Sequence, residues 1–431
     1  MIDLHLLRTQ PDTVKAAIAR RGESTTALDE TISCDRQHRQ ILGKINEMRS
    51  EINRISASVG SLHRDGRHNE TAELKARSRE LGNRLTEITA EADELAAQIS
   101  RTLLKIPNLP ADDCPSGASA DDNVVTKVVG YDTDSYTECQ RMPHWEIGEA
   151  LGILDMNRAA RMSGSMFAMY RGEGARLARA LIEYGLDRNR DLYEEIRPPT
   201  LVRTEVMTST GHLPKFVDDA YHIERDNLWP IPTAEVPLTS LLSGEIVDEA
   251  DLPVRLMAHT SCFRREAGSA GSKTRGLLRV HEFDKVELYG FCTPAQAADI
   301  HAEILGRAEQ AIADLGLAYR ILDLCDADLG EASARTFDIE AYAPGADQWL
   351  EVSSVSWCRA YQARRANIRY RPRSTRPTEG KRTQMVHTLN GSGLAVPRVW
   401  AALVETHHQP DGRIAVPEAL QPYMGGATAI G

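Results

Sequence analysis

The sequence predicts an α+β protein that begins with an antiparallel α-helical coiled-coil arm and continues as a large mixed body. Three observations support this prediction. Apolar residues recur every three or four positions through the N-terminal quarter of the 431-residue chain. Residues 105–123 are then rich in Pro, Asp, Ser and Gly, which is typical of a linker. From about residue 143 to the end, helix-like and strand-like patterns alternate without an internal repeat.

The composition excludes several classes of protein. Hydrophobic residues make up 42% of the chain and charged residues 26%, which rules out a wholly disordered protein. No run approaches the roughly 18 apolar residues of a membrane span, and the first residues do not resemble a secretory signal. Seven scattered cysteines without a CxxC pair indicate free thiols in a reducing compartment. We therefore expect a cytoplasmic protein with no membrane contact, no disulfide framework and no zinc.

Two helices with narrow apolar seams are expected in the arm, at about residues 28–102. Residues 60–70 between them contain two glycines and several polar residues, which indicates a reversal of the chain. Helices of about 30 residues, rising about 1.5 Å per residue, would each extend on the order of 45 Å. The seams consist of Leu28, Ile32, Ile41, Ile45, Met48, Ile52, Ile55 and Val59, and of Leu74, Leu81, Leu85, Ile88, Ala92, Leu95 and Ile99.

The arm has two interpretations from its pattern alone. It is either a dimerisation or spacer element, or an arm that grips a long partner. Phosphate contacts by basic residues in its distal half would suit the second interpretation. Interleaved acids and the net charge of −11 instead fit an ordinary solvated surface. The basic residues are Arg49, Arg54, Arg64, Arg67, Lys75, Arg77, Arg79 and Arg84.

Residues 261–291 carry the densest chemistry in the body. Two strand-like segments flank a glycine-rich basic loop, which predicts a long hairpin with a mobile loop. Period-two alternation places Arg264 with Glu266 on one face of the first strand. A face with cations for phosphate and an aromatic ring for a base suits a nucleotide pocket, whereas a solvent-facing polar strand is the alternative. In the second strand the alternation gathers Arg279, His281, Phe283, Lys285 and Glu287 on one face and Val280, Val286 and Leu288 on the other.

This segment, FRREAGSAGSKTRGLLRVHEFDKVEL, resembles motif 2 of class II aminoacyl-tRNA synthetases, and specifically of seryl-tRNA synthetases. Other segments resemble the family in order along almost the whole chain. They include GARLARALIEYGLDRNRDLYEEIRPPTLV as motif 1 (about 174–202), the serine-binding loop IPTAEVPLT, the segment EVSS, and HTLNGSGLAVPRVWAALVE, which covers motif 3 (about 388–406). So many ordered matches make chance similarity an unsatisfactory explanation.

The resemblance implies a fold and a domain organisation. Residues 1–104 would form a tRNA-binding domain, 105–142 a linker leading into the body, and 143–431 the catalytic domain. The catalytic domain would contain an antiparallel sheet of six or seven strands flanked by helices. It would form a homodimer, with Pro198 and Pro199 at the dimer-forming end of motif 1.

The implied reaction is ATP-dependent activation of L-serine to seryl-adenylate, followed by transfer to the 3′-hydroxyl of tRNA(Ser). The arm would grip the long variable arm and elbow of that tRNA through its shape and backbone. By resemblance, Arg264 would bind the α-phosphate and the serine carboxylate, and Arg398 would hold the distal phosphate. Mg²⁺ would be held by Glu351 with Ser354. The ATP site would comprise Arg264, Glu266, Val280, Phe283, Glu351, Val352, Ser353, Ser354 and Arg398, and the serine site Thr233, Ala234, Glu235, Arg264, Glu287, Asn390 and Ser392.

Several of these residues have simpler interpretations. Glu351 could be an acid at a strand edge, Arg398 a surface residue, and Asn390 with the glycine after it a hairpin turn. Ser269 and Lys273 would contact ATP or the tRNA end, or belong only to a mobile loop. The basic segment 371–382 is either a tRNA-facing loop or an exposed turn, and the adjacent histidines 407 and 408 are expected at the surface or a dimer contact.

Other positions depart from the family pattern and suggest a specialised second copy. Such an enzyme would serve a biosynthetic pathway or resist an inhibitor that mimics seryl-adenylate. Two further functions stay open: a ligase that loads serine onto a carrier protein or small molecule, whose relatives lack the arm, and a non-catalytic binder, which would have lost the central arginines or Glu351. The departures are His212, Glu282, Val355, Trp357, Arg359, Ala360 and Pro397.

Overall fold

The computed structural model describes residues 1–64, 67–267, 275–373 and 382–431. The chain divides into two compact units. One comprises Ile2–Ala19 and Glu23–Ile106, and the other comprises Met1, Arg20–Gly22 and Pro107–Gly431. Ser269, Lys273 and most of the basic segment 371–382 lie outside the described residues, so the expectations about them stay predictions.

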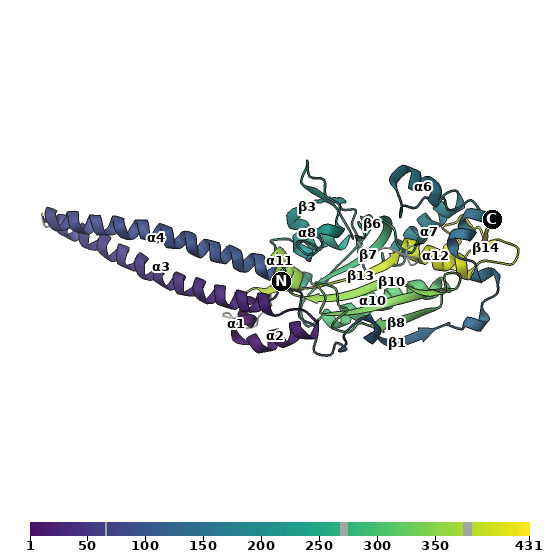
Figure 1. Ribbon diagram of the computed structural model, residues 1–431, viewed down its shortest axis with the longest axis horizontal. Coiled ribbons are helices and arrows are strands. Elements are labelled where there is room, and N and C mark those ends of the chain that lie inside the picture. Colours follow the sequence, from purple (N-terminus) through teal and green to yellow (C-terminus); the bar gives the residue numbers. More distant parts are fainter. Residues whose placement is uncertain (65–66, 268–274, 374–381) are drawn as a thin grey trace. The chain divides into compact units, whose positions relative to one another are not determined.

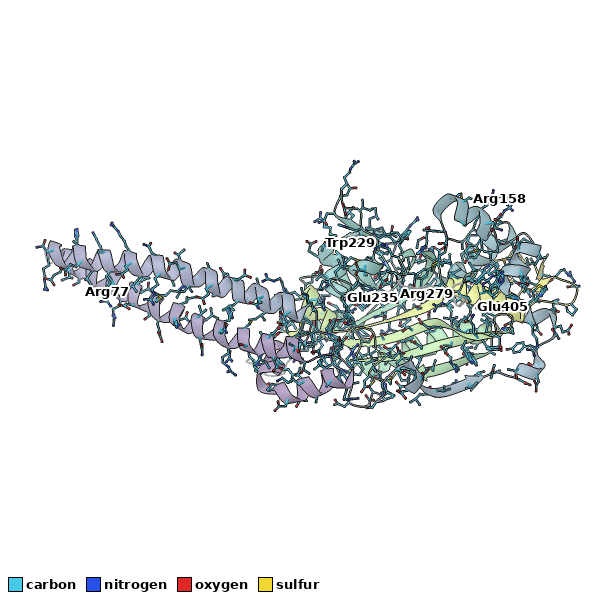
Figure 2. All side chains as sticks on the ribbon, in the orientation of Figure 1. Arg77, Arg158, Trp229, Glu235, Arg279 and Glu405 are labelled. Carbon is cyan, nitrogen blue, oxygen red and sulfur yellow. The ribbon has the colours of Figure 1, made fainter. Side chains whose placement is uncertain are left out.

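The first unit is helical and contains the predicted coiled-coil arm. Two long helices run antiparallel and pack along their length (Figure 1). A buried cluster of Ile41, Ile45 and Ala92 joins them, with partly buried Leu85 and Leu95 against it, so both predicted seams meet. An exposed ion pair, Arg77 Nη2 to Glu51 Oε1 at 2.6 Å, also links the two helices (Figure 2). The helices are α1 (Leu4–Thr9), α2 (Pro11–Arg20), α3 (Thr26–Arg64) and α4 (His68–Leu103).

The second unit is built on an eight-stranded sheet, slightly larger than the expected six or seven strands. Every neighbouring pair is antiparallel except the parallel pair at one edge, where two residues, Glu194 and Glu195, lie beside β6. The sheet order is β1 (Val124–Val129), β8 (Tyr319–Asp323), β9 (Arg335–Ala343), β10 (Gln348–Arg359), β13 (His387–Ala395), β7 (Glu282–Cys292), β6 (Val254–Phe263) and β2 (Glu194–Glu195).

Shorter strands and eight helices complete the described part of this unit (Figure 1). Three small sheets pair β3 (Leu201–Arg203) with β4 (Leu228–Pro230), β14 (Ile414–Ala415) with β15 (Ala429–Ile430), and β11 (Arg369–Arg371) with both β12 (Gln384–Met385) and β5 (Ile246–Asp248). The helices are α5 (His144–Ala150), α6 (Met156–Ser163), α7 (Glu173–Asp187), α8 (Thr204–Thr210), α9 (Glu235–Ser240), α10 (Ala297–Asp314), α11 (Tyr361–Ala366) and α12 (Val396–Thr406).

The main core lies between one face of the large sheet and helices α7, α10 and α12. Val286, Leu288 and Val355 point into it, which leaves the alternate residues of β7 and β10 on the opposite face. Gly391 lies in the middle of β13, so the interpretation of Asn390 and Gly391 as a hairpin turn is wrong. A Cβ at residue 391 would lie 2.4 Å from Ile304 Cγ2, because α10 packs closely on this strand.

Among the residues that the structure describes, no helix is both long enough and apolar enough to cross a membrane.

Candidate active site

A cavity of about 600 Å³ opens on the sheet face opposite the helical core. Residues of the β6–β7 hairpin, β10, β13, the segment before α9 and the start of α12 line it, among them Glu235 and Arg279 (Figure 2). Most of the predicted site residues come together here. They are Thr233, Glu235, Arg264, Glu266, Val280, Phe283, Glu287, Glu351, Val352, Ser354, Asn390, Ser392 and Arg398.

Two predicted site residues do not line the cavity. The side chain of Ser353 is buried and donates from Oγ to the carbonyl of Ser392 at 2.7 Å. It therefore joins β10 to β13 beneath the site. Ala234 is fully buried in an apolar cluster with Leu238 and Tyr289.

Two carboxylates, the partly buried Glu235 and the buried Glu287, form one end of the cavity. Glu235 accepts hydrogen bonds from Gln362 Nε2 at 2.5 Å and from Asn390 Nδ2 at 3.1 Å. Glu287 accepts from Thr233 Oγ1 at 2.8 Å and forms an ion pair with Lys285. Burial raises the pKa of Glu235 to about 7, and the nearby Glu287 carboxylate adds to this rise. A small cationic ligand would relieve both effects.

Gln362 supports this end of the cavity, and the sequence reasoning missed it. The side chain is fully buried at the start of α11. Besides its bond to Glu235, Nε2 donates to the carbonyl of Thr210 at 3.3 Å. Its Oε1 accepts from Thr388 Oγ1 at 2.7 Å and from Tyr289 OH at 3.1 Å. The only signal for it was its place inside the family-like segment QARRANIRYR, because its partners lie far away along the chain.

Cations and an aromatic ring form the other end of the cavity. The Arg264 guanidinium lies 5.1 Å from the centre of the Phe283 ring. Arg398, at the start of α12, donates from Nη1 to the carbonyl of Glu351 at 2.9 Å and lies 3.7 Å from the Glu351 carboxylate. Arg398 thus lines the cavity and is held by Glu351, with about a third of its side chain exposed. Glu266 forms an ion pair with Arg279 across the base of the hairpin loop.

The predicted alternation fails just before β7. Strand β6 ends at Phe263 and β7 begins at Glu282, so period two does not govern residues 264–281. Val280 consequently lines the cavity instead of facing away from it. His281 lies outside the cavity-lining set, and its Nδ1 lies 3.0 Å from the carbonyl of Arg264. Lys285 does lie on the cavity side, as the alternation predicted, although it was not among the predicted site residues.

Three oxygen-bearing side chains, those of Glu351, Ser354 and Asp338, lie near the cationic end of the cavity. Glu351 and Ser354 line the cavity, and Asp338 on β9 lies directly opposite Ser354 in the strand register. The Oδ1 atom of Asp338 is buried and has no hydrogen-bond partner among the described residues. Burial, followed by the nearby Glu351 carboxylate, raises the pKa of Asp338 well above its usual range. Oxygen ligands and an unsatisfied carboxylate fit a hard divalent cation such as Mg²⁺.

Among the described residues, no three His, Cys, Asp or Glu side chains lie together so that they could hold a metal ion. The Mg²⁺ assignment therefore depends on phosphate oxygens to complete the coordination, as is usual for this ion.

The residues that depart from the family pattern fall on two sides of the sheet. His212 and Pro397 line the cavity. Burial and the charges of Arg264 and Lys285 lower the pKa of His212 to about 3, so its imidazole is neutral. Trp357 instead lies behind the cavity, where its Nε1 donates to His387 Nδ1 at 3.2 Å and Arg359 packs over its ring. Val355 points into the main core.

Of the adjacent histidines near the C-terminus, His408 is buried, contrary to a surface position, and His407 is partly buried, whereas the expected dimer contact stays a prediction. His407 Nε2 lies 2.8 Å from the carbonyl of Leu315, and His408 Nδ1 lies 2.8 Å from the carbonyl of Cys139. Both rings are partly or fully buried within the chain.

Two family models match the chain. Residues 1–110 match the seryl-tRNA synthetase N-terminal domain, and residues 221–407 match the tRNA synthetase class II core domain (G, H, P, S and T). The serine–tRNA ligase of Herpetosiphon aurantiacus is 43% identical over 434 residues, covering all of both proteins. That of Haloquadratum walsbyi is 42% identical over 448 residues, covering all of this chain and 96% of the relative.

The fold agrees with these matches. The crystal structure of seryl-tRNA synthetase from Pyrococcus horikoshii complexed with ATP superposes with a TM-score of 0.91 at 34% identity, covering all of this chain and 99% of that one. The matches to these relatives and the match of the fold both extend over the full length of the chain. The chain belongs to the seryl-tRNA synthetase family, the serine–tRNA ligases among the class II aminoacyl-tRNA synthetases.

Proposed function

We propose that this chain activates L-serine with ATP to form seryl-adenylate and then transfers the seryl group to the 3′-hydroxyl of tRNA(Ser). The observation that carries the proposal is the two-ended cavity. Its carboxylate end, Glu235 with Glu287, adjoins a cationic and aromatic end, Arg264 with Phe283 and Arg398. The ATP complex of the Pyrococcus horikoshii enzyme, which shares this fold, supports ATP as the second substrate.

The carboxylate end suits the small polar amino acid. Glu235 would pair with the serine ammonium group, and Glu287, Thr233, Asn390 and Ser392 would surround the rest of the molecule. Such buried polar groups reject an analogue that lacks the hydroxyl, because they are then left without a partner. This is the expected basis for choosing serine over alanine.

The cationic end suits the transfer chemistry. A serine carboxylate oxygen attacks the α-phosphorus of ATP, a new O–P bond forms, and the bond to pyrophosphate breaks. Arg264 would bind the α-phosphate and the serine carboxylate, which places the reacting atoms together and stabilises the charge that develops. Phe283 would stack on adenine and Arg398 would hold the distal phosphate. Mg²⁺ held by Glu351 and Ser354 would neutralise phosphate charge.

We further propose the expected domain roles and a homodimer. The helical domain, residues 1–104, would bind the tRNA, and residues 143–431 would carry out catalysis. Leu192 and Leu201 flank the prolines of motif 1 and are 40% and 44% exposed, which supports a contact between two copies there. The arm weighs against the alternative of a ligase that loads serine onto a carrier protein or small molecule.

Serine-dependent exchange of pyrophosphate into ATP, measured beside charging of total tRNA, tests the proposed function. We expect both activities with serine and neither with alanine. Exchange without charging would favour the carrier ligase. Absence of exchange with every amino acid would leave only a non-catalytic binder.

The KM for serine is expected to rise as the pH falls through about 7. Glu235 is protonated below its pKa of about 7, and a neutral carboxyl cannot pair with the serine ammonium group. Because this pKa lies above the ordinary value of 4.5, the free energy of unfolding should also fall as the pH rises from about 4.5 to 7, where the carboxyl ionises in the unfolded chain but stays largely protonated in the folded one. In Glu235→Gln the KM should be high and independent of pH between 6 and 8. A pH-dependent KM in that variant would contradict the assignment.

The hypothesis of a specialised second copy now depends on His212 and Pro397, since the two lie in the cavity. If they confer resistance to a non-hydrolysable seryl-adenylate analogue, the double variant His212→Gln, Pro397→Gly should bind it about tenfold more tightly, or about 1.4 kcal/mol. Trp357→Phe is the control, because Trp357 lies behind the cavity. Equal inhibition of the double variant and the unmodified chain would rule out this resistance.

A further inference from the structure

A fully buried histidine–glutamate pair lies near the cationic end of the cavity, where the phosphates of ATP would bind. His144 begins α5, Glu405 lies near the end of α12 (Figure 2), and neither side chain is exposed. Glu405 Oε1 accepts from the backbone N–H of His144 at 2.8 Å and lies 2.7 Å from His144 Nδ1. Its Oε2 accepts from the N–H groups of Gly345 and Ala346 at 2.9 and 3.1 Å. The reaction proposed above uses neither side chain.

The second ring nitrogen of His144 reaches the hairpin that forms the ATP end. Nε2 lies 3.0 Å from the backbone N–H of Leu277, which can only donate. Nε2 is therefore the acceptor, and Nδ1 carries the hydrogen that is donated to Glu405. The imidazole thus connects the hairpin to the carboxylate through one defined tautomer.

The next residue of the hairpin is bonded to the same helix at its other end. The carbonyl of Leu278 accepts from Arg398 Nε at 3.1 Å. Arg398 and Glu405 are seven residues apart on α12, about two helical turns, so they lie on the same side of the helix. Leu277 and Leu278 are therefore held at two points by one helix, directly before the cavity residues Arg279 and Val280.

The residues before Leu277 pack against the start of α5. Gly276 has φ +64°, and a Cβ there would lie 2.4 Å from His144 Nε2 and 2.8 Å from the Trp145 ring. The Arg275 guanidinium lies 4.9 Å from the centre of the Trp145 ring. The chain leaving the glycine-rich loop thus lies directly against the first two residues of α5.

We propose that His144 and Glu405 are positioning residues for ATP. Their bonds hold the segment of the hairpin before β7 on α12, and this sets Arg398, Arg279 and Val280 at the distances that ATP requires. The serine end lies on other supports, chiefly Gln362, so the pair should govern ATP affinity and leave serine affinity nearly unchanged. This inference rests on the proposed function for its substrate, but ATP binding alone can be measured without serine.

Two substitutions of His144 separate its two bonds. Asparagine can place an amide near the position of Nδ1, which keeps the bond to Glu405 but loses Leu277. Glutamine can place its carbonyl oxygen near the position of Nε2, which keeps an acceptor for Leu277. We expect His144→Asn to weaken ATP binding, measured by calorimetry, about tenfold, and to raise the KM for ATP equally while the KM for serine changes less than about twofold. His144→Gln should recover ATP binding to within about threefold of the unmodified chain.

A matched control lies on the same helix terminus. His407→Asn removes a partly buried histidine bond to the Leu315 carbonyl, because asparagine does not reach the position of Nε2, and it does not touch Leu277. It should lower the Tm comparably yet leave both KM values unchanged. Equal effects of His144→Asn and His407→Asn on ATP binding, or an unchanged ATP affinity in His144→Asn, would overturn the proposal.

A second variant tests the same contact without changing a core side chain, in case the histidine variants do not fold. Gly276→Ala should displace the His144–Leu277 contact from the hairpin side and weaken ATP binding to a similar extent. Tight ATP binding by Gly276→Ala would contradict the proposal. If the unmodified chain binds ATP but shows no serine-dependent exchange, the proposed function fails while the positioning role can still be tested by calorimetry.

Discussion

Arg264→Ala is expected to lower kcat/KM for serine-dependent ATP–pyrophosphate exchange by about a thousandfold, since one well-placed charged donor is worth on this order in a partly dry site. Arg264 follows the end of β6, lies over the Phe283 ring, and lines the cavity together with Arg398. In the proposed function it contacts both the serine carboxylate and the α-phosphate. The loss should appear mainly in kcat, because the charge it stabilises develops in the transition state.

The neighbouring arginine provides the control for this prediction. Arg265 is exposed and donates from Nη1 to the carbonyl of Asp218 at 3.0 Å, outside the cavity-lining set. Arg265→Ala should keep kcat/KM within about twofold, in line with the small effects of most surface changes. Similar losses in both variants would mean that the hairpin, and not the Arg264 guanidinium, is the sensitive element.

The arm and much of the site could be predicted from the sequence for different reasons. The two apolar seams of the arm follow from local periodicity, and Ile41, Ile45 and Ala92 do meet between the helices. In the hairpin, periodicity correctly put Phe283, Lys285 and Glu287 on one face. It failed at Val280 and His281, because period two holds only where strands pair, and pairing begins at Glu282.

The supports of the site could not be predicted because they join residues distant in sequence. Gln362 contacts Glu235 across 127 positions, and His144 contacts Glu405 across 261. Neither pair has a local pattern, since a buried polar group is satisfied by whatever the fold brings near it. Asn390 shows the opposite error: the dipeptide with Gly391 looks like a turn locally, but the tight packing of α10 on β13 requires glycine there.

Shortening the arm is expected to abolish tRNA charging while leaving amino-acid activation intact. Joining Met48 to Leu85 by a short glycine-rich turn would remove the distal half but keep the Ile41, Ile45 and Ala92 cluster. Serine-dependent exchange should stay within about twofold of the full chain, whereas kcat/KM for charging should fall at least about a hundredfold. The physical reason is that the shortened arm lacks the distal cations. Each phosphate of the tRNA that such a cation neutralises would add salt-dependent binding affinity.

A variant that removes charge without shortening the arm distinguishes tRNA binding by the arm from a role as a spacer. Arg54, Arg79 and Arg84 are exposed on the distal half, whereas Arg77 is already paired with Glu51. Replacing the first three with glutamine should weaken charging and reduce the slope of log affinity against log salt by about 0.9 for each phosphate that is no longer neutralised. Arg77→Gln, the control, should change that slope less. A shortened arm that still charges tRNA normally would mean that the coiled coil is only a spacer or dimer contact, and that tRNA is held by the catalytic domain alone.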